Sequence, residues 1–180
     1  GMAVVKRNIE KSRVYQSGLC PLGINIGKNF DTPVDQAVDD YLLGLRQFYD
    51  LASYITVNIS SPNTPGLRGL QEGQALESLL AAISQLRGEL ADQSGRYVPL
   101  ALKIAPDMDT EQIGHVADCL VEYKMDAVIA TNTTLDRSAV MKSRHADEQG
   151  GLSGGPLQER SNEIVALLKQ RLADRMPIIL

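Results

Sequence analysis

The sequence predicts a parallel α/β fold that forms part of a barrel of repeated strand–helix units. Three observations support this prediction. Five short apolar segments alternate with helical patterns along the 180 residues, which is typical of parallel sheets. Polar side chains stand at the ends of four successive strands, and no helix follows the last apolar segment, Pro177–Leu180. A complete barrel of eight units needs about 250 residues. We therefore expect a partial barrel of about five strands, with residues 1–180 as one domain.

The first part of the chain alternates between helical and strand patterns. Apolar residues recur at helical spacing over residues 2–16, before Gly18, and a short strand follows at 23–26. Pro33 favours the start of a helix that runs to about Leu51. The apolar residues expected on the buried face of this helix are Val34, Val38, Leu42 and Leu45.

The same alternation continues to the end of the chain. Asp109 is a suitable N-cap for a helix that ends near Tyr123. The last segment, 177–180, is predicted to be one more buried strand. The other predicted segments are a strand at 54–59, a polar loop at 60–73, a helix at about 75–91, a strand at 98–104, a strand at 127–131, a loop at 132–156 and a helix at about 158–173.

Two parallel architectures compete for this pattern: a complete five-stranded doubly wound sheet and part of a barrel. The polar residues at the strand ends favour the barrel, where all such ends converge on one mouth. In an open sheet, ligands gather at one switch point and most strand ends lie far from it. The residues concerned are Asn25, Asn58, Ser60, Lys103, Thr131 and Asn132.

Composition and charge exclude several classes of protein. Apolar residues make up 43% and charged residues 22% of the chain, as in ordinary globular domains. No apolar run approaches the ~18 residues that span a bilayer. The net charge is −4 and no basic stripe is visible, which argues against nucleic acid as a partner. Cys20 and Cys119 lie far apart without metal-like spacing, so we expect two reduced thiols.

The most informative segment is the loop Asn58-Ile59-Ser60-Ser61-Pro62-Asn63-Thr64-Pro65-Gly66-Leu67-Arg68. Two prolines and a glycine restrict its backbone, and they are surrounded by amides and hydroxyls. An asparagine amide offers both a donor and an acceptor. That combination suits a planar heterocycle with alternating carbonyl and N–H groups, so we predict a binding loop here and not a plain surface turn.

Three further segments carry candidate site residues. Lys103 ends an apolar strand, where it could place a positive charge beside an electron-rich cofactor or a developing anion. Thr131 and Asn132 end the next strand in the same way. The glycine-rich segment 150–155 precedes a helix, where its backbone could approach a ligand closely. A simple loop-to-helix turn explains this last segment equally well.

The two histidines do not indicate a metal or hydrolase site. His115 lies within a predicted helix and His145 in a charged loop. Neither has a third ligand or a triad partner at a recognisable spacing, so the sequence predicts no zinc site and no serine-hydrolase triad.

Five segments in this order resemble class 2 dihydroorotate dehydrogenases, the quinone-linked, FMN-containing enzymes of pyrimidine synthesis. The serine at position 61, where class 1 enzymes carry cysteine, points to class 2. The resemblance covers nearly the whole chain and implies a TIM (β/α)8 barrel with FMN at its mouth. The segments are 23–29, 58–68, 102–107, 129–134 and 150–156.

The resemblance also implies roles for individual residues. Ser61 would be the base that removes the C5 proton of dihydroorotate while hydride passes from C6 to the flavin, and Thr64 with a water would provide the proton path. The residues that match pyrimidine-binding positions are Asn58, Asn63, Asn132 and Thr133. The residues that match FMN-binding positions are Asn25, Asn58, Lys103, Thr131, Ser153 and Gly154.

The family chain is nearly twice as long, so the resemblance implies a central fragment. We expect the parent enzyme to bind dihydroorotate and a quinone, the latter through an N-terminal segment absent here, and to lie peripherally on the cytoplasmic side of the inner membrane. The fragment itself is expected to be soluble, inactive alone, and able to dimerise through its open strand edges. Two alternatives remain: another FMN-dependent barrel oxidoreductase, or a non-enzymatic α/β switch module.

Overall fold

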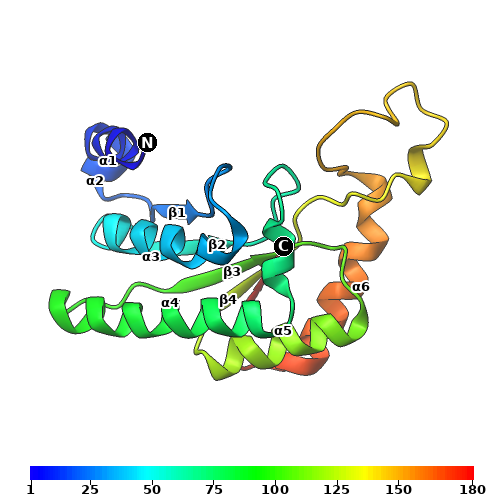
Figure 1. Ribbon diagram of the computed structural model, residues 1–180. Coiled ribbons are helices and arrows are strands. Elements are labelled where there is room, and N and C mark those ends of the chain that lie inside the picture. Colours follow the sequence, from blue (N-terminus) through cyan, green and yellow to red (C-terminus); the bar gives the residue numbers. More distant parts are fainter.

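The computed structural model describes all 180 residues and contains one sheet of five parallel strands. The strands lie side by side in chain order, β1-β2-β3-β4-β5 (Figure 1). A doubly wound sheet would reverse its order at a switch point, whereas a barrel adds each strand beside the one before it. The strand order therefore indicates part of a barrel and not a doubly wound sheet. The strand bounds are Gly23–Ile26, Tyr54–Asn58, Leu100–Ile104, Ala127–Ala130 and Ile178–Ile179.

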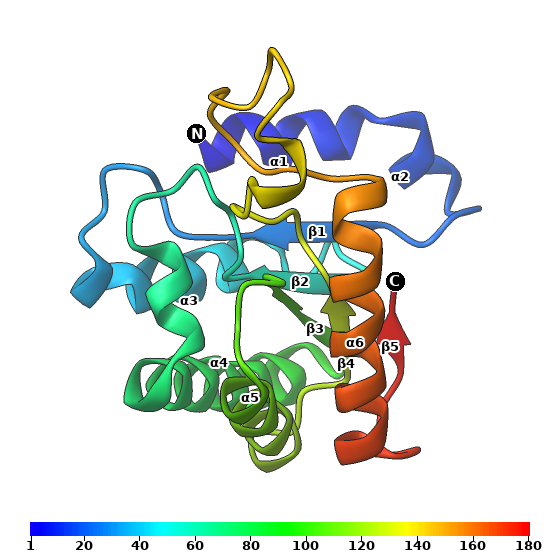
Figure 2. The same ribbon diagram turned by 90° about the vertical axis from the view of Figure 1, so that its right-hand side faces the viewer.

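Helices connect the strands in the order that the sequence predicts. Six α-helices are α1 Met2–Lys11, α2 Arg13–Ser17, α3 Ala37–Phe48, α4 Gly73–Ser94, α5 Thr110–Glu122 and α6 Gly155–Leu172. Three 3₁₀ turns are η1 Val34–Gln36, η2 Leu67–Gln71 and η3 Ser138–Val140. No helix combines the length and the apolar composition that crossing a bilayer requires. Figure 2 shows the strands turning from β1, which lies across the view, to β4 and β5, which point upward.

The strand register separates an apolar face from a polar face. Ile55 pairs with Leu100 and Val57 with Leu102, and all four side chains are fully buried in the main core. Alternate residues point to the opposite face. There, Asn58 pairs with Lys103. The core therefore lies between the sheet and its helices, and the other face keeps its polar groups available.

Helix α5 begins where the sequence predicts. The Asp109 carboxylate accepts a hydrogen bond from the backbone N–H of Gln112 at 2.8 Å, and the Gln112 side chain accepts one from the Asp109 N–H at 2.8 Å. This reciprocal pair satisfies two backbone donors at the helix start. It fixes where the loop after β3 ends, which matters because that loop carries Asp107.

Two of the predicted helices differ in detail from the structure. The helix predicted over 2–16 breaks at Ser12, whose side chain caps α2. The helix after Pro33 begins with the 3₁₀ turn η1, which shifts its phase. Its buried residues are therefore Ala37, Tyr41, Gly44, Leu45 and Phe48. Of the residues predicted for that face, Leu45 is buried, Val38 and Leu42 are half-buried, and Val34 is exposed.

The last strand is also less buried than predicted. Ile179 is 42% exposed and Leu180 is 86% exposed. The reason is that β5 has a neighbouring strand on one side only, because it pairs with β4 alone. Only Ile178 packs, partly buried, against the core.

An ion pair with a buried arginine lies at the end of the sheet opposite the polar strand ends. Arg87 of α4 is 5% exposed and donates from Nη1 to Asp126 Oδ2 and to the Tyr97 hydroxyl, both at 2.8 Å. Asp126 Oδ2 also accepts from the backbone N–H of Leu100 at 2.8 Å. The guanidinium stacks over the Tyr97 ring at 5.1 Å from its centroid. This cluster therefore attaches α4 to the starts of β3 and β4.

We predict that Arg87→Met lowers the free energy of unfolding by about 2–3 kcal/mol, because it leaves the Asp126 carboxylate partly buried without its cation. Urea denaturation followed by circular dichroism measures the change. The matched control is Arg46→Met, whose ion pair with Glu89 is long, at 3.8 Å, and exposed; its effect should stay within about 0.5 kcal/mol. Equal effects of the two substitutions would contradict the role assigned to the Arg87 cluster.

Candidate functional site

The loops that follow the strands project from one end of the sheet (Figure 1), and these loops and the strand ends carry the polar residues predicted for the site. Asn58 ends β2 and stands beside Lys103 of β3 in the register. Ser61 follows β2, and Asn132 follows β4. Asn25 lies on β1, the edge strand, opposite Thr56. Because neighbouring parallel strands end at the same edge, these side chains share one rim of the partial barrel.

Asn58, Ser60 and Asn132 form a hydrogen-bonded chain across two strand ends. Asn58 Oδ1 accepts from the Ser60 backbone N–H at 3.1 Å and from the Ser60 hydroxyl at 2.7 Å. Asn132 Nδ2 donates to Ser60 Oγ at 2.9 Å. Ser60 is fully buried. The two asparagines are therefore held through a serine between them, and Asn58 Nδ2 forms no hydrogen bond with the protein.

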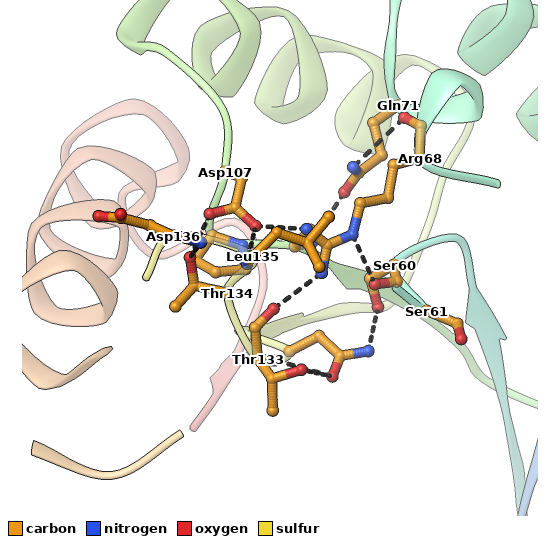
Figure 3. Close-up of polar contacts among 12 residues, drawn as sticks. Ser60, Ser61, Arg68, Gln71, Asp107, Thr133, Thr134, Leu135 and Asp136 are labelled. Atoms are coloured by element: carbon orange, nitrogen blue, oxygen red, sulfur yellow. Dashed lines mark hydrogen bonds and ion pairs between the residues drawn. The ribbon is translucent and has the colours of Figure 1, made fainter. Parts of the chain in front are cut away.

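Arg68 connects the loops that follow β2, β3 and β4 (Figure 3). Its Nε donates to the Ser60 carbonyl at 3.1 Å, and its Nη2 donates to the Thr133 carbonyl at 2.8 Å. Its Nη1 forms an ion pair with Asp107. A guanidinium presents donors in a fixed planar fork, so one side chain can satisfy all three segments.

Asp107 extends this connection along the loop after β4. Besides Arg68, it accepts a hydrogen bond from the Thr134 hydroxyl and one from the Leu135 backbone N–H, the latter at 3.1 Å. From the other side, Gln71 supports the same region: its Oε1 accepts from the Ala105 N–H at 2.7 Å, and the residue is 2% exposed. Each of the three loops thus has a fixed partner in another loop.

The buried hydroxyl of Tyr41 holds the end of β2 from the helix layer. It donates to the Asn58 carbonyl at 2.8 Å. Burial raises the pKa of Tyr41 well above its ordinary value, so the hydroxyl remains a donor at all ordinary pH values. The backbone of Asn58 is therefore fixed from outside the sheet while its side chain faces the rim.

Ser61 and Thr64 lie close together in the same loop. Their hydroxyl oxygens are 3.5 Å apart, and the Asn63 backbone N–H donates to Ser61 Oγ at 3.3 Å. Ser61 and Thr64 are half-buried, and Asn63 is exposed.

Gly66 has φ of 68°, and a Cβ there would lie 2.5 Å from Val34 Cγ2. Only glycine fits at that turn, which returns the chain from the loop towards η2.

The glycine-rich segment folds back onto the loop after β4. Thr134 and Leu152 form an antiparallel bridge, with N–H to carbonyl distances of 3.0 and 2.7 Å. A Cβ on Gly151 would lie 1.7 Å from Thr133 Oγ1, so the close approach requires glycine. A simple loop-to-helix turn, the other interpretation of this segment, therefore does not explain its contacts with the loop after β4. The segment also covers Thr133, one of the predicted substrate residues.

The remaining predicted residues lie nearby without joining the chain of hydrogen bonds. Ser153 and Gly154 are exposed at the start of α6, and Thr131 Oγ1 donates to Ser161 of that helix at 3.4 Å. Asn25 is exposed and Lys103 is half-buried, and neither side chain has a hydrogen-bond or ion-pair partner in the protein. Free amide and ammonium donors of this kind remain available for a ligand.

A hollow of about 530 Å³ lies between the Ser61 loop and residues 146–150. Asn63, Leu135 and Arg137 are among the residues that line it. Arg137 Nη2 donates to the carbonyls of Glu148 and Gly150, whereas its buried Nη1 has no partner. Arg137 therefore lines the hollow while one of its guanidinium nitrogens is buried without a hydrogen-bond partner.

Arg68, Gln71 and Asp107 were not predicted as site residues from the sequence, although Arg68 and Asp107 lie within the motifs singled out there. Arg68 ends the loop motif and Asp107 follows Pro106. An arginine and an aspartate in the loops after two successive strands could have indicated an ion pair between those loops. Gln71 and the buried side chain of Thr134 carried no comparable signal, because their partners are backbone groups or residues far along the chain.

Comparisons with known proteins agree over the whole chain. The family model described as dihydroorotate dehydrogenase matches residues 1–180. The chain is 54% identical over 179 residues to the dihydroorotate dehydrogenase (quinone) of Herminiimonas arsenicoxydans, covering 99% of this chain and 52% of that protein. It is 59% identical over 158 residues to the protein of the same name from Pseudomonas fluorescens strain Pf0-1, covering 88% and 47%.

A solved structure shows the same fold. The crystal structure of DHODH in complex with ferulenol from Eimeria tenella matches with a TM-score of 0.87 and 35% identity, over 99% of this chain and 52% of that chain. The chain thus spans about half the length of the relatives that it matches. Because the family model, the sequence identities and the fold agree, the chain belongs to the dihydroorotate dehydrogenase family.

Proposed function

We propose that this chain is the central part of a quinone-dependent dihydroorotate dehydrogenase, which oxidises dihydroorotate to orotate in pyrimidine biosynthesis. The observation that carries the proposal is the rim on which Asn58 stands beside Lys103 in the register, next to the Ser61 loop, with Asn58 and that loop held by the Arg68 network. Family membership argues against the non-enzymatic switch module. A dihydroorotate–quinone assay on the protein expressed from its complete reading frame separates this function from that of another flavin barrel oxidoreductase.

The pyrimidine site in this proposal consists of Asn58, Asn63, Asn132 and Thr133. Asn58 keeps a free Nδ2, and the exposed Asn63 side chain has no partner in the protein. Asn132 still has one amide hydrogen beyond its bond to Ser60. Alternating donors and acceptors of this kind match the carbonyl and N–H groups around a dihydropyrimidine ring, so the four residues would orient the substrate above the rim.

The cofactor proposed here is FMN, held by Asn25, Asn58, Lys103, Thr131, Ser153 and Gly154. The support is that the donors of Asn25 and Lys103 are unpaired and that the Gly154 backbone, at φ 81°, is exposed at a helix start. Helix N-termini favour anionic groups. FMN, when bound, supplies the acceptor for the hydride from C6. Lys103 would hold a positive charge beside the ring, where negative charge develops.

Ser61 is the proposed base that takes the C5 proton. A serine hydroxyl is a weak base by itself, so it needs a route by which its own proton can leave. Thr64 Oγ1, 3.5 Å away, provides the next oxygen on that route. The Asn63 backbone N–H, which donates to Ser61 Oγ, orients the hydroxyl oxygen.

The quinone partner and the location are proposed for the whole protein. We infer that the quinone binds through an N-terminal segment outside this chain, and that the parent lies peripherally on the cytoplasmic side of the inner membrane. The 180 residues alone are proposed to be a soluble partial FMN-binding barrel domain with little activity. The open edges of β1 and β5 could pair two such fragments.

We predict that Ser61→Ala in the protein from the complete reading frame slows cofactor reduction by about 10²–10⁴-fold, the usual contribution of a general base. Orotate affinity should change little, because the asparagines that bind the ring remain. Stopped-flow absorbance of the flavin measures the rate, and orotate titration measures the affinity. Ser61→Cys keeps a proton acceptor, and with an ordinary thiol pKa of about 8.5 it should shift the pH profile to lower pH. An unchanged reduction rate with weakened orotate binding would make Ser61 a binding residue only.

We predict that Lys103→Met lowers the midpoint potential of bound FMN by on the order of tens of millivolts, because a fixed positive charge stabilises the reduced form. Lys103→Arg keeps the charge and should stay near the wild-type potential. Potentials are measured by dye-coupled spectroscopic titration. If Lys103→Met left the potential unchanged, the lysine would have no electrostatic role at the ring.

A further inference from the structure

Three side chains with metal-binding atoms meet between two helices of the helix layer. Glu77 comes from α4, and His115 and Cys119 come from α5. His115 Nε2 lies 3.7 Å from Glu77 Oε1 and 3.6 Å from Cys119 Sγ. The ligand atoms of all three residues lie within 4.8 Å of one another. None of these side chains joins the Arg68 network.

The helix geometry accounts for the cluster. His115 and Cys119 are four residues apart, so they lie on the same face of α5, one turn from each other. That face packs beside α4, which adds Glu77. Cys119 is 3% exposed, whereas the His115 and Glu77 side chains are 33% and 35% exposed. A soft sulfur ligand therefore lies at the bottom of the cluster, and nitrogen and oxygen ligands lie at its opening.

The charges around the cluster favour a cation. Glu77 has no lysine or arginine partner, and its only ionic contact is with His115. Beside His115 lies a hollow of about 280 Å³ that is lined by three more carboxylate residues, Glu72, Asp109 and Glu111. No basic side chain other than His115 lines this hollow. A divalent cation would therefore approach through an acidic opening.

Both distances from His115 Nε2 are close to those between ligands of one tetrahedral zinc ion, and the third pair of ligand atoms lies within 4.8 Å. Zinc lies about 2.3 Å from sulfur, 2.0–2.1 Å from nitrogen and 2.0–2.2 Å from oxygen, so tetrahedral ligands lie roughly 3.4–3.6 Å apart. The observed separations of 3.6 and 3.7 Å agree closely with these values. A thiolate, an imidazole and a carboxylate are also the ligand types that zinc prefers.

We propose that Glu77, His115 and Cys119 form a Zn²⁺ site that fastens α4 to α5, with water from the acidic hollow as the fourth ligand. Binding replaces the Cys119 thiol proton, which passes to solvent, by a zinc–sulfur bond. No electron transfer is involved. Because metal binding to the folded state alone stabilises that state, the site would strengthen the helix layer without acting on the substrate.

The test uses the protein from its complete reading frame, first stripped of metal with a chelator. Wild type is expected to bind one equivalent of Zn²⁺ by calorimetry, and one equivalent of Co²⁺ with a thiolate-to-cobalt charge-transfer band. Cys119→Ser should abolish that band. His115→Gln and Glu77→Gln should each weaken binding by at least about 10- to 100-fold. Zn²⁺ should raise the melting temperature of wild type more than that of any of these variants.

The chain offers matched controls. Cys20→Ser removes the other cysteine, which is exposed, and His145→Gln removes the other histidine. Both should bind metal as wild type does. Glu77 is partly exposed, so Glu77→Gln tests the site even if substitution of the buried Cys119 impairs folding. Dihydroorotate oxidation by Glu77→Gln should equal that of wild type. The proposal is overturned if wild type binds no stoichiometric metal, or if His115→Gln and Glu77→Gln bind it as tightly as wild type.

Discussion

The arrangement of the rim depends on one guanidinium. Arg68 contacts the Ser60 carbonyl after β2, Asp107 after β3 and the Thr133 carbonyl after β4. Loops at the ends of separate strands are otherwise independent, and each would lose its own conformational entropy on ordering. A shared cation orders them together. The Arg68 side chain is 17% exposed and that of Asp107 is 30% exposed, so solvent screens the ion pair only in part. The planar geometry of the guanidinium then determines the positions of the three loops relative to one another.

The preorganisation of the asparagines is a consequence of this constraint. Because Arg68 fixes the Ser60 carbonyl, the Ser60 side chain is positioned to bond both Asn58 and Asn132. Those bonds define which way each amide faces. Asn58 is left with its Nδ2 free, beside Lys103 in the register. A ligand then meets donors that are already oriented, which lowers the entropic cost of binding and of reaching the reactive geometry.

Sequence patterns predicted the alternation of strands and helices well, because burial on one face imposes regular spacing on residues such as Ile55, Val57, Leu100 and Leu102. The phase of α3 was missed, since nothing local reveals that η1 precedes it. The strand-end polar residues and the loop of Ser61 were predicted from position and composition. The partners of Arg68 were not, because Asp107 lies 39 residues away in the chain. The Glu77–His115–Cys119 cluster was missed for the same reason: Glu77 is on another helix, and only the packing of α4 against α5 brings it to His115.

Hydrogen exchange of an Arg68→Gln variant tests the central role of this side chain most directly. Arg96→Gln is the matched control, because Arg96 donates to the carbonyls of Asp50 and Ala52 near the start of β2, at the opposite end of the sheet. Arg68→Gln should accelerate exchange in residues 60–66 and 132–136 by at least about tenfold, with the core strands unchanged, whereas Arg96→Gln should leave both segments as in wild type. Wild-type protection of both loops in Arg68→Gln would show that Arg68 does not order them.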